Sequence, residues 1–137
     1  MNIKNEIAFN SQAVAFGTNV NYDPTKRYGV ENNAVYRFSD KFKANGNLNL
    51  IQAKFKKGDF KGNNIPLVSS WTAGGGVLWN IFEDKLTLSG TVNWWDRRYL
   101  ENDERNIFEK IPATVITDLK LGGQLHFKTY GNATWSA

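Results

Sequence analysis

Strict alternation of apolar and polar side chains, repeated over segments of about ten residues, constrains the fold of this chain most. The clearest segment places on one side Trp71, Ala73, Gly75, Val77, Trp79 and Ile81. Its other side carries Thr72, Gly74, Gly76 and Asn80, with Leu78 as the exception. A period of two residues is typical of a β-strand with two different faces. The chain is therefore expected to be all-β.

Similar alternation recurs along the sequence, in residues 34–38, 42–50, 86–94 and 115–127. Two connections are short and polar, around Asp40 and Asp84, whereas residues 10–27, 56–66 and 97–112 form long polar connections. Transmembrane β-barrels have short turns at one end and long loops at the other. The pattern predicts an antiparallel up-and-down meander of about seven strands, forming an incomplete part of a transmembrane β-barrel.

Composition excludes several other classes of protein. The 137 residues include no cysteine, which excludes disulfides and thiolate metal sites, and no apolar run approaches the ~18 residues of a membrane-spanning helix. Polar residues follow Met1 directly, so we expect no signal peptide in this sequence. The net charge is +4, and the lysine and arginine residues are scattered among acidic residues. This distribution argues against a nucleic-acid partner.

Tryptophan and tyrosine positions fit the edges of a membrane. Trp71 and Trp79 are eight residues apart, which corresponds to roughly 26 Å of strand. Aromatic rings with a polar group are favoured at both membrane interfaces. The aromatic residues that we expect at the interfaces are Trp71, Trp79, Trp94, Trp95 and Tyr36. Alternation alone also fits a soluble sheet whose apolar face is its core.

Three segments resemble the barrel of TonB-dependent outer-membrane receptors. "NYDPTKRYGVEN" resembles a loop-to-strand entry of that family, and its matching residues are Lys26, Arg27, Gly29, Val30 and Glu31. "FKGNNIPLVSSWTAGGGVLW" is similar to a segment that re-enters the barrel, carried by Gly62, Asn63, Ile65, Pro66, Leu67 and Val68. "YLENDERNIFEKIPATVITDLKL" is similar to the next loop and strand, with Asn102, Asp103, Asn106, Ile111, Pro112, Asp118 and Leu119. The order of the segments matches the family.

The resemblance implies a function in transport. It implies a bacterial outer-membrane receptor for a large nutrient such as a ferric siderophore, with outer-membrane lipid around it. Residues 1–137 would be a single segment from the C-terminal part of a barrel, without the plug domain through which such receptors contact the TonB energy-coupling system. On its own, an open sheet of this kind is expected to aggregate at its edges.

Candidate sites in the sequence are few. Following the resemblance, we expect Arg97, Arg98 and Arg105 in an external loop to contact an anionic ligand such as an iron chelate. The acidic run from Glu101 to Glu104 lacks the glycine and terminal glutamate of a calcium loop, and His126 has no partner for a zinc site. "AGGGVLW" lacks the Lys-Ser/Thr of a phosphate loop. We predict no catalytic residue, metal or cofactor, and no enzyme activity.

Two other interpretations remain open at this point. A soluble carbohydrate-binding β-sandwich has short strands and uses exposed aromatic rings to stack on sugars. Its connections, however, need not alternate between short and long. A complete small eight-stranded membrane barrel is the other alternative, although the sequence does not end on an aromatic residue.

Overall fold

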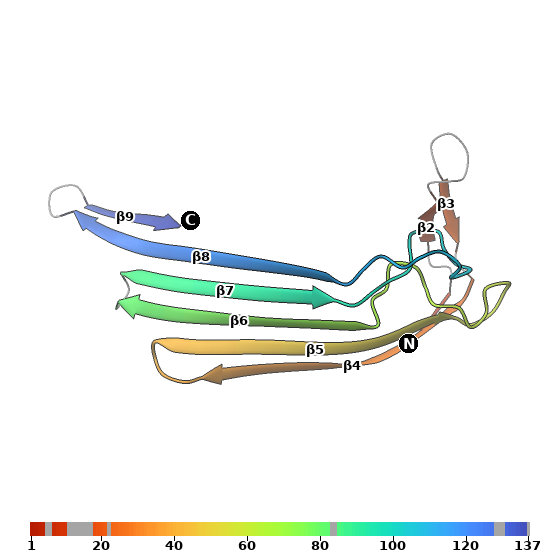
Figure 1. Cartoon of the computed structure of the whole chain (residues 1–137), viewed down its shortest axis with the longest axis horizontal. Coiled ribbons are helices and arrows are strands. Elements are labelled where there is room, and N and C mark those ends of the chain that lie inside the picture. The colour runs from red at the N-terminus through yellow and green to blue at the C-terminus, as the bar shows by residue number, and fades with distance from the viewer. Residues whose placement is uncertain (5–6, 11–17, 22, 83–84, 128–130, 137) are drawn as a thin grey trace. The chain divides into compact units, whose positions relative to one another are not determined.

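The structure is a computed structural model that describes residues 1–4, 7–10, 18–21, 23–82, 85–127 and 131–136 (Figure 1). All regular structure in these residues is β-strand. The strands are β1 (Asn2–Ile3), β2 (Ile7–Asn10), β3 (Thr18–Asn21), β4 (Thr25–Arg37), β5 (Phe42–Phe55), β6 (Trp71–Phe82), β7 (Leu86–Trp95), β8 (Thr114–Phe127) and β9 (Gly131–Ser136). Within these described ranges, no helix has the length and hydrophobicity that crossing a membrane requires.

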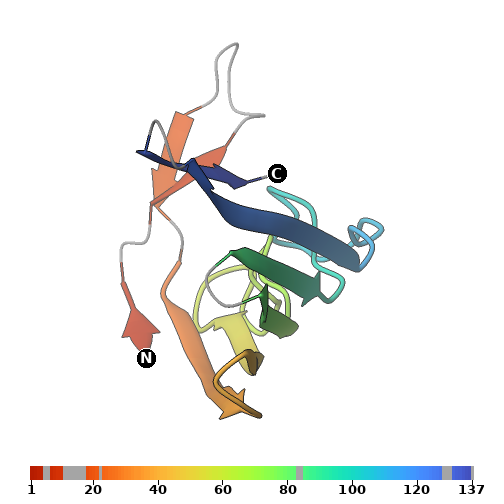
Figure 2. The same ribbon diagram turned by 90° about the vertical axis from the view of Figure 1, so that its left-hand side faces the viewer.

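The main sheet has seven strands in the order β1-β4-β5-β6-β7-β8-β9. Six of them, β4 to β9, follow one another in chain order and run antiparallel. Figures 1 and 2 both show β6, β7 and β8 side by side in that order. The predicted all-β meander is therefore confirmed. A separate pair, β2 and β3, forms a two-stranded antiparallel sheet.

The N-terminal strands extend further than the sequence pattern indicates. The pattern predicts a strand only over residues 34–38, but β4 begins at Thr25. The expected long loop of residues 10–27 contains β3 and the first residues of β4. Backbone pairing explains the difference, because the first residues of β4 pair with β1, where Asn2 lies opposite Lys26. Hydrogen bonds of this kind do not depend on apolar side chains.

The predicted turn around Asp40 joins β4 to β5. The hydroxyl oxygen of Ser39 accepts a hydrogen bond from the backbone N–H of Phe42 at 3.1 Å, and the N–H of Phe38 donates to the carbonyl of Phe42 at 3.0 Å. A serine hydroxyl that binds nearby backbone in this way favours a tight turn. The second predicted turn, at Glu83 and Asp84, lies outside the described residues.

The chain divides into two compact units. Unit 1 comprises Met1–Val30, Asn49–Thr72 and Trp95–Thr114, and unit 2 comprises Glu31–Leu48, Ala73–Trp94 and Val115–Ala137. Unit 1 contains a small hydrophobic core of Ala53, Phe55 and Ile65, against which Ile51, Phe60 and Val68 pack. Among the described residues, every buried hydrophobic side chain belongs to unit 1.

Candidate membrane face and ligand-binding loops

One side of the sheet in unit 2 is lined by asparagine and threonine. The glycines of β6 make room for these side chains. A Cβ on Gly74 would lie 2.9 Å from Oδ1 of Asn93 and 3.0 Å from Nδ2 of Asn47, and a Cβ on Gly76 would lie 2.8 Å from Oδ1 of Asn45. At such distances the amide ends of these asparagine side chains would have to shift to make room for a Cβ. Gly74 and Gly76 therefore leave room for the asparagine side chains of a polar face.

Hydrogen bonds join the polar side chains of neighbouring strands on this face. The hydroxyl of Thr87 in β7 donates to Oδ1 of Asn80 in β6 at 3.0 Å. The hydroxyl of Thr91 in β7 lies 3.4 Å from a carboxylate oxygen of Asp118 in β8. Cross-strand pairs of this kind stabilise a sheet and keep its polar groups satisfied. The arrangement fits a hydrated surface.

The other side of the same sheet is aliphatic and exposed. A Cβ on Gly90 would contact Leu119 at 3.6 Å and Val77 at 3.7 Å, which places these residues together on one face. Leu119 is 74% exposed although it is a large apolar side chain. By strand alternation, the exposed large hydrophobic residues on this face of unit 2 are Tyr36, Leu48, Val77, Trp79, Val92, Val115 and Leu119, whereas Val35, Phe82 and Ile116 lie on the opposite face. A contiguous surface of this kind normally marks a partner or a membrane.

The predicted interfacial aromatic residues lie on the strands as expected. Trp71 and Trp79 are both 47% exposed and occupy the same side of β6 by strand alternation, and Tyr36 is 64% exposed. Trp94 and Trp95 are half-buried. Because these two residues are adjacent at the end of β7, they point to opposite faces of the sheet. Their position at a membrane interface stays a prediction.

In unit 1, the long connection after β5 folds back over that strand. The N–H of Ile65 donates to the carbonyl of Ala53 at 3.1 Å, and the ring of Phe60 lies 5.9 Å from that of Phe55. Phe55 and Ile65 are almost fully buried by this contact. Burial of three apolar side chains fixes the path of the connection. This segment is a packed structure and not an open polar loop.

Asn106 joins the connection after β7 to the connection after β5. Its Oδ1 accepts a hydrogen bond from the N–H of Asn64 at 2.7 Å, and its Nδ2 donates to the carbonyl of Asn64 at 3.0 Å. Asn106 has a φ of 56°, a left-handed conformation that asparagine tolerates better than most residues. A third bond runs from Nδ2 of Asn63 to the carbonyl of Glu104 at 2.8 Å. The two connections therefore brace each other.

The acidic run contains one buried carboxylate. Asp103 is 2% exposed, and its two carboxylate oxygens accept hydrogen bonds from the N–H groups of Ile107 at 3.0 Å and Phe108 at 3.2 Å. This part of the long polar connection of residues 97–112 is thus ordered around the Asp103 side chain. No group of three or more metal-binding side chains occurs among the residues that the structure describes. Asp103 has a structural function, which its sequence context did not indicate.

A small basic hollow lies beside these connections. Its volume is about 20 Å³, which is room for one water molecule, and Arg97, Tyr99 and Lys110 line its rim together with residues of β5 and the connection after it. The ammonium of Lys110 lies 4.6 Å from the centre of the Tyr99 ring. Lys110 was not expected from the sequence. It reaches this position because Arg98 and Ile111 form a β-bridge that folds the connection on itself.

The other predicted ligand contacts do not share this hollow. Arg98 is half-buried, and its Nη1 is buried without a hydrogen-bond partner. Arg105 is exposed. The structure thus brings Arg97 together with Lys110, whereas neither Arg98 nor Arg105 lines the same hollow. The backbone of His126 lies in β8 opposite Asn132, but the side chain of His126 lies outside the described part of the structure.

A sequence model of the family described as "TonB dependent receptor-like, beta-barrel" matches residues 1–136. The chain belongs to the TonB-dependent receptor β-barrel family. No curated protein matches its sequence. Among solved structures, it is similar to the ferric yersiniabactin uptake receptor FyuA from Yersinia pestis, with a TM-score of 0.65 and 20% identity. The match covers 88% of this chain and 23% of FyuA, so the chain spans less than a quarter of that receptor.

Membership in the TonB-dependent receptor family bears on the soluble alternative left open by the sequence. The family consists of transport receptors of bacterial outer membranes, so a soluble carbohydrate-binding sandwich is excluded. The topology agrees, because a sandwich requires two sheets that pack face to face. The described residues instead form a seven-stranded sheet and a two-stranded pair. Walls of membrane β-barrels carry an outward apolar band, and the exposed large apolar side chains of unit 2 agree with such a wall.

Proposed function

We propose that this chain forms part of the wall and external loops of an outer-membrane receptor that takes up a ferric siderophore or a similar large iron chelate. The observation that carries the proposal is the family match over residues 1–136. The siderophore class is supported by the similarity to FyuA, which is a ferric yersiniabactin uptake receptor. Uptake would be coupled to the TonB system of the inner membrane through a plug domain.

The wall is proposed to be completed by other strands of a larger receptor. The diameter of a barrel grows with its number of strands, and this chain covers 23% of FyuA. In the described sheet, β1 and β9 are the edge strands. An open edge in lipid costs several kcal/mol for each unpaired N–H or C=O group. Pairing of both edges with further strands, and a plug domain from the same receptor, would remove this cost.

The basic hollow is proposed to contact the anionic part of the ligand. Arg97 is exposed and lies with Lys110 at the rim of the hollow, so two positive charges meet on the braced connections. Charge-assisted hydrogen bonds from arginine and lysine to carboxylates are about twice as strong as neutral ones. The Asn106–Asn64 brace holds these groups in place before a ligand arrives, which lowers the entropic cost of binding.

The test uses the full-length receptor that carries this sequence, with Arg97→Ala, Lys110→Ala and the double variant. We expect the affinity for ferric siderophores, measured by intrinsic fluorescence titration, to fall about tenfold for each substitution, because each removes a charged hydrogen bond. Lys120→Ala, an exposed lysine in β8, is the matched control and should leave affinity unchanged. Unchanged affinity in the double variant, or no uptake of radiolabelled ferric chelates by the parent, would contradict the proposal.

A further inference from the structure

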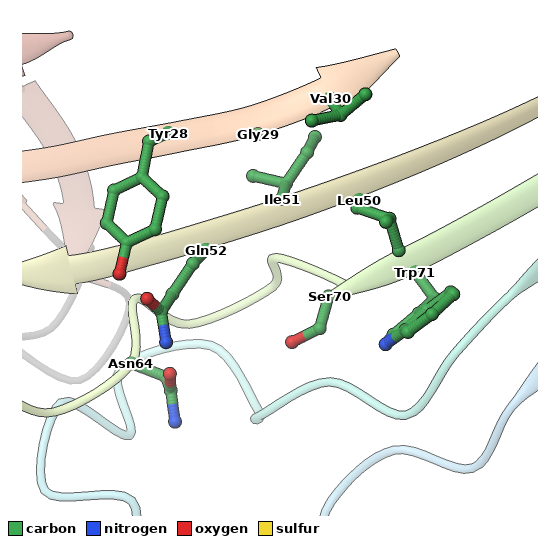
Figure 3. Close-up of a pocket in the computed structure, with 9 residues that line it drawn as sticks. All are labelled: Tyr28, Gly29, Val30, Leu50, Ile51, Gln52, Asn64, Ser70 and Trp71. Carbon is green, nitrogen blue, oxygen red and sulfur yellow. The ribbon is translucent and has the colours of Figure 1, made fainter. Parts of the chain in front are cut away.

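A groove of about 380 Å³ lies in unit 1 where β4, β5 and the start of β6 meet (Figure 3). It is lined by Tyr28, Gly29, Val30, Leu50, Ile51, Gln52, Asn64, Ser70 and Trp71. Gly29 is required here, because a Cβ at this position would collide with the carbonyl oxygen of Leu50. The volume of the groove is far larger than that of the small basic hollow, so the groove can hold a segment of a flexible molecule.

The groove lining passes from apolar to polar along the strands. Val30 and Leu50 are aliphatic, and the next residues on the same sides of β4 and β5 are Tyr28 and Gln52. Tyr28 is 55% exposed, and Trp71 borders the groove from β6. Aliphatic side chains followed by tyrosine and tryptophan reproduce the order of environments from the bilayer interior to its interface. The groove is therefore amphipathic.

Two lysines lie beyond the tyrosine ring, so the groove passes from aliphatic to aromatic and then to charged side chains. The ammonium of Lys26 lies 5.3 Å from the centre of the Tyr28 ring. Lys26 lies opposite Asn2 in the register of β1 and β4, and Nζ of Lys56 is 3.5 Å from Oδ1 of Asn2. Lys26 and Lys56 thus both lie near Asn2, one by strand register and one by a side-chain contact, at the polar end of the groove. A pair of ammonium groups beside an interfacial aromatic ring suits an anionic headgroup.

We propose that the groove binds one membrane lipid with a phosphate-bearing, anionic headgroup. An acyl chain would lie against Val30, Leu50 and Trp71, and the phosphate would lie between the two lysines. This proposal rests on the membrane location in the proposed function, but the lipid site is separate from the basic hollow. Charge complementarity selects the occupant: a zwitterionic lipid gains little from two neighbouring ammonium groups.

Quenching of Trp71 by brominated lipid tests the site in the full-length receptor reconstituted in bilayer nanodiscs. A brominated phosphatidylglycerol and a brominated phosphatidylcholine would be titrated separately, each at low mole fraction in unlabelled phosphatidylcholine. The contribution of Trp71 is obtained by subtracting the signal of Trp71→Phe. We expect half-maximal quenching of Trp71 at a lower mole fraction of the anionic lipid than of the zwitterionic one.

Substitution of the lysines should remove this preference. Lys26→Gln and Lys56→Gln should each raise the mole fraction of anionic lipid at half-maximal quenching about fivefold. Lys120→Gln, which removes an exposed lysine of β8, should leave it unchanged. Equal quenching of Trp71 by both lipids, or no effect of the two lysine substitutions, would overturn the proposed lipid site.

Trp79 separates failure of the lipid site from failure of the membrane location. Its contribution is obtained in the same way from Trp79→Phe, and we expect both brominated lipids to quench it similarly. If Trp79 is quenched but Trp71 shows no preference, the lipid site is wrong and the membrane location stands. If neither tryptophan is quenched by any brominated lipid, the membrane location and the lipid site are both wrong.

Discussion

The two compact units of this chain are stabilised in different ways. Unit 1 buries Ala53, Phe55 and Ile65 and connects its long segments through buried polar contacts of Asn106 and Asp103. Unit 2 has no buried hydrophobic residue among those described, and it exposes large apolar side chains from β4 to β8. Unit 1 thus contains a core of the kind found in water-soluble proteins. Unit 2 is a single layer of sheet. Its apolar side must be covered by an apolar environment outside the unit.

The comparison explains why one sequence combines bare glycine with tryptophan. In unit 2, Gly74 and Gly76 leave room for asparagine side chains on the polar face, whereas Trp79 lies on the opposite, exposed face. In a soluble sheet, the face that carries tryptophan would be covered by a second layer. In a barrel wall, lipid covers it. With the membrane location that we propose, the two faces contact different solvents, and this accounts for the combination.

The largest expected effect is the loss of the core of unit 1. Phe55→Ala removes an aromatic side chain that is 2% exposed and contacts the Phe60 ring. Such truncations cost about 3–5 kcal/mol of folding free energy. Denaturant unfolding of the receptor in detergent should show this loss together with faster proteolysis of residues 56–70. A loss below about 1 kcal/mol would mean that unit 1 is not held together by its core.

A charge on the exposed face of unit 2 should cost nearly as much, but only in a bilayer. Val92→Arg places a guanidinium on the apolar side of β7, where a charge costs about 2–4 kcal/mol at the bilayer midplane. Thr91→Arg, the matched control, places it on the opposite face of the same strand. Unfolding in lipid vesicles should separate the two variants. Equal stability of both would contradict a lipid-facing side.

Loss of the brace between the connections of unit 1 should have an intermediate effect. Asn106→Ala leaves the N–H and carbonyl of Asn64 without their partner, at a cost of about 1–3 kcal/mol. Amide hydrogen exchange should increase in residues 61–66 and 102–108, while exchange in β6 and β7 stays unchanged. If exchange rises equally in both units, they are not energetically separate.

The smallest expected effect concerns a polar cross-strand pair. Nδ2 of Asn49 donates to the hydroxyl of Thr72 at 3.1 Å in a part-buried position. Asn49→Ala should lower the unfolding free energy by about 0.5–1.5 kcal/mol, the net value of one such hydrogen bond. The double variant Asn49→Ala/Thr72→Val should recover part of this loss, because no unpaired group remains. A loss unchanged by the second substitution would show that the two side chains act independently.

The sequence predicted the strands of unit 2 better than the contacts of unit 1. Strand starts at Trp71 and Leu86 follow from alternation, which is local and depends only on which face each residue occupies. The brace between Asn64 and Asn106 joins residues 42 positions apart, and no period or motif indicates it. For the same reason Lys110 was missed as a neighbour of Arg97. Contacts between distant segments depend on backbone conformations, such as the left-handed Asn106, that composition does not reveal.

The most direct test of the account is a spin-label scan of β7 in lipid bilayers. The described chain has no native cysteine, so single cysteines can be introduced at Leu88, Ser89, Thr91, Val92 and Asn93 for labelling. We predict that labels at Leu88 and Val92 are relaxed mainly by oxygen dissolved in the lipid. Labels at Ser89, Thr91 and Asn93 should be relaxed mainly by a water-soluble nickel chelate. Uniform accessibility along β7, without a period of two, would contradict the claim that one face of this sheet contacts lipid and the other contacts water.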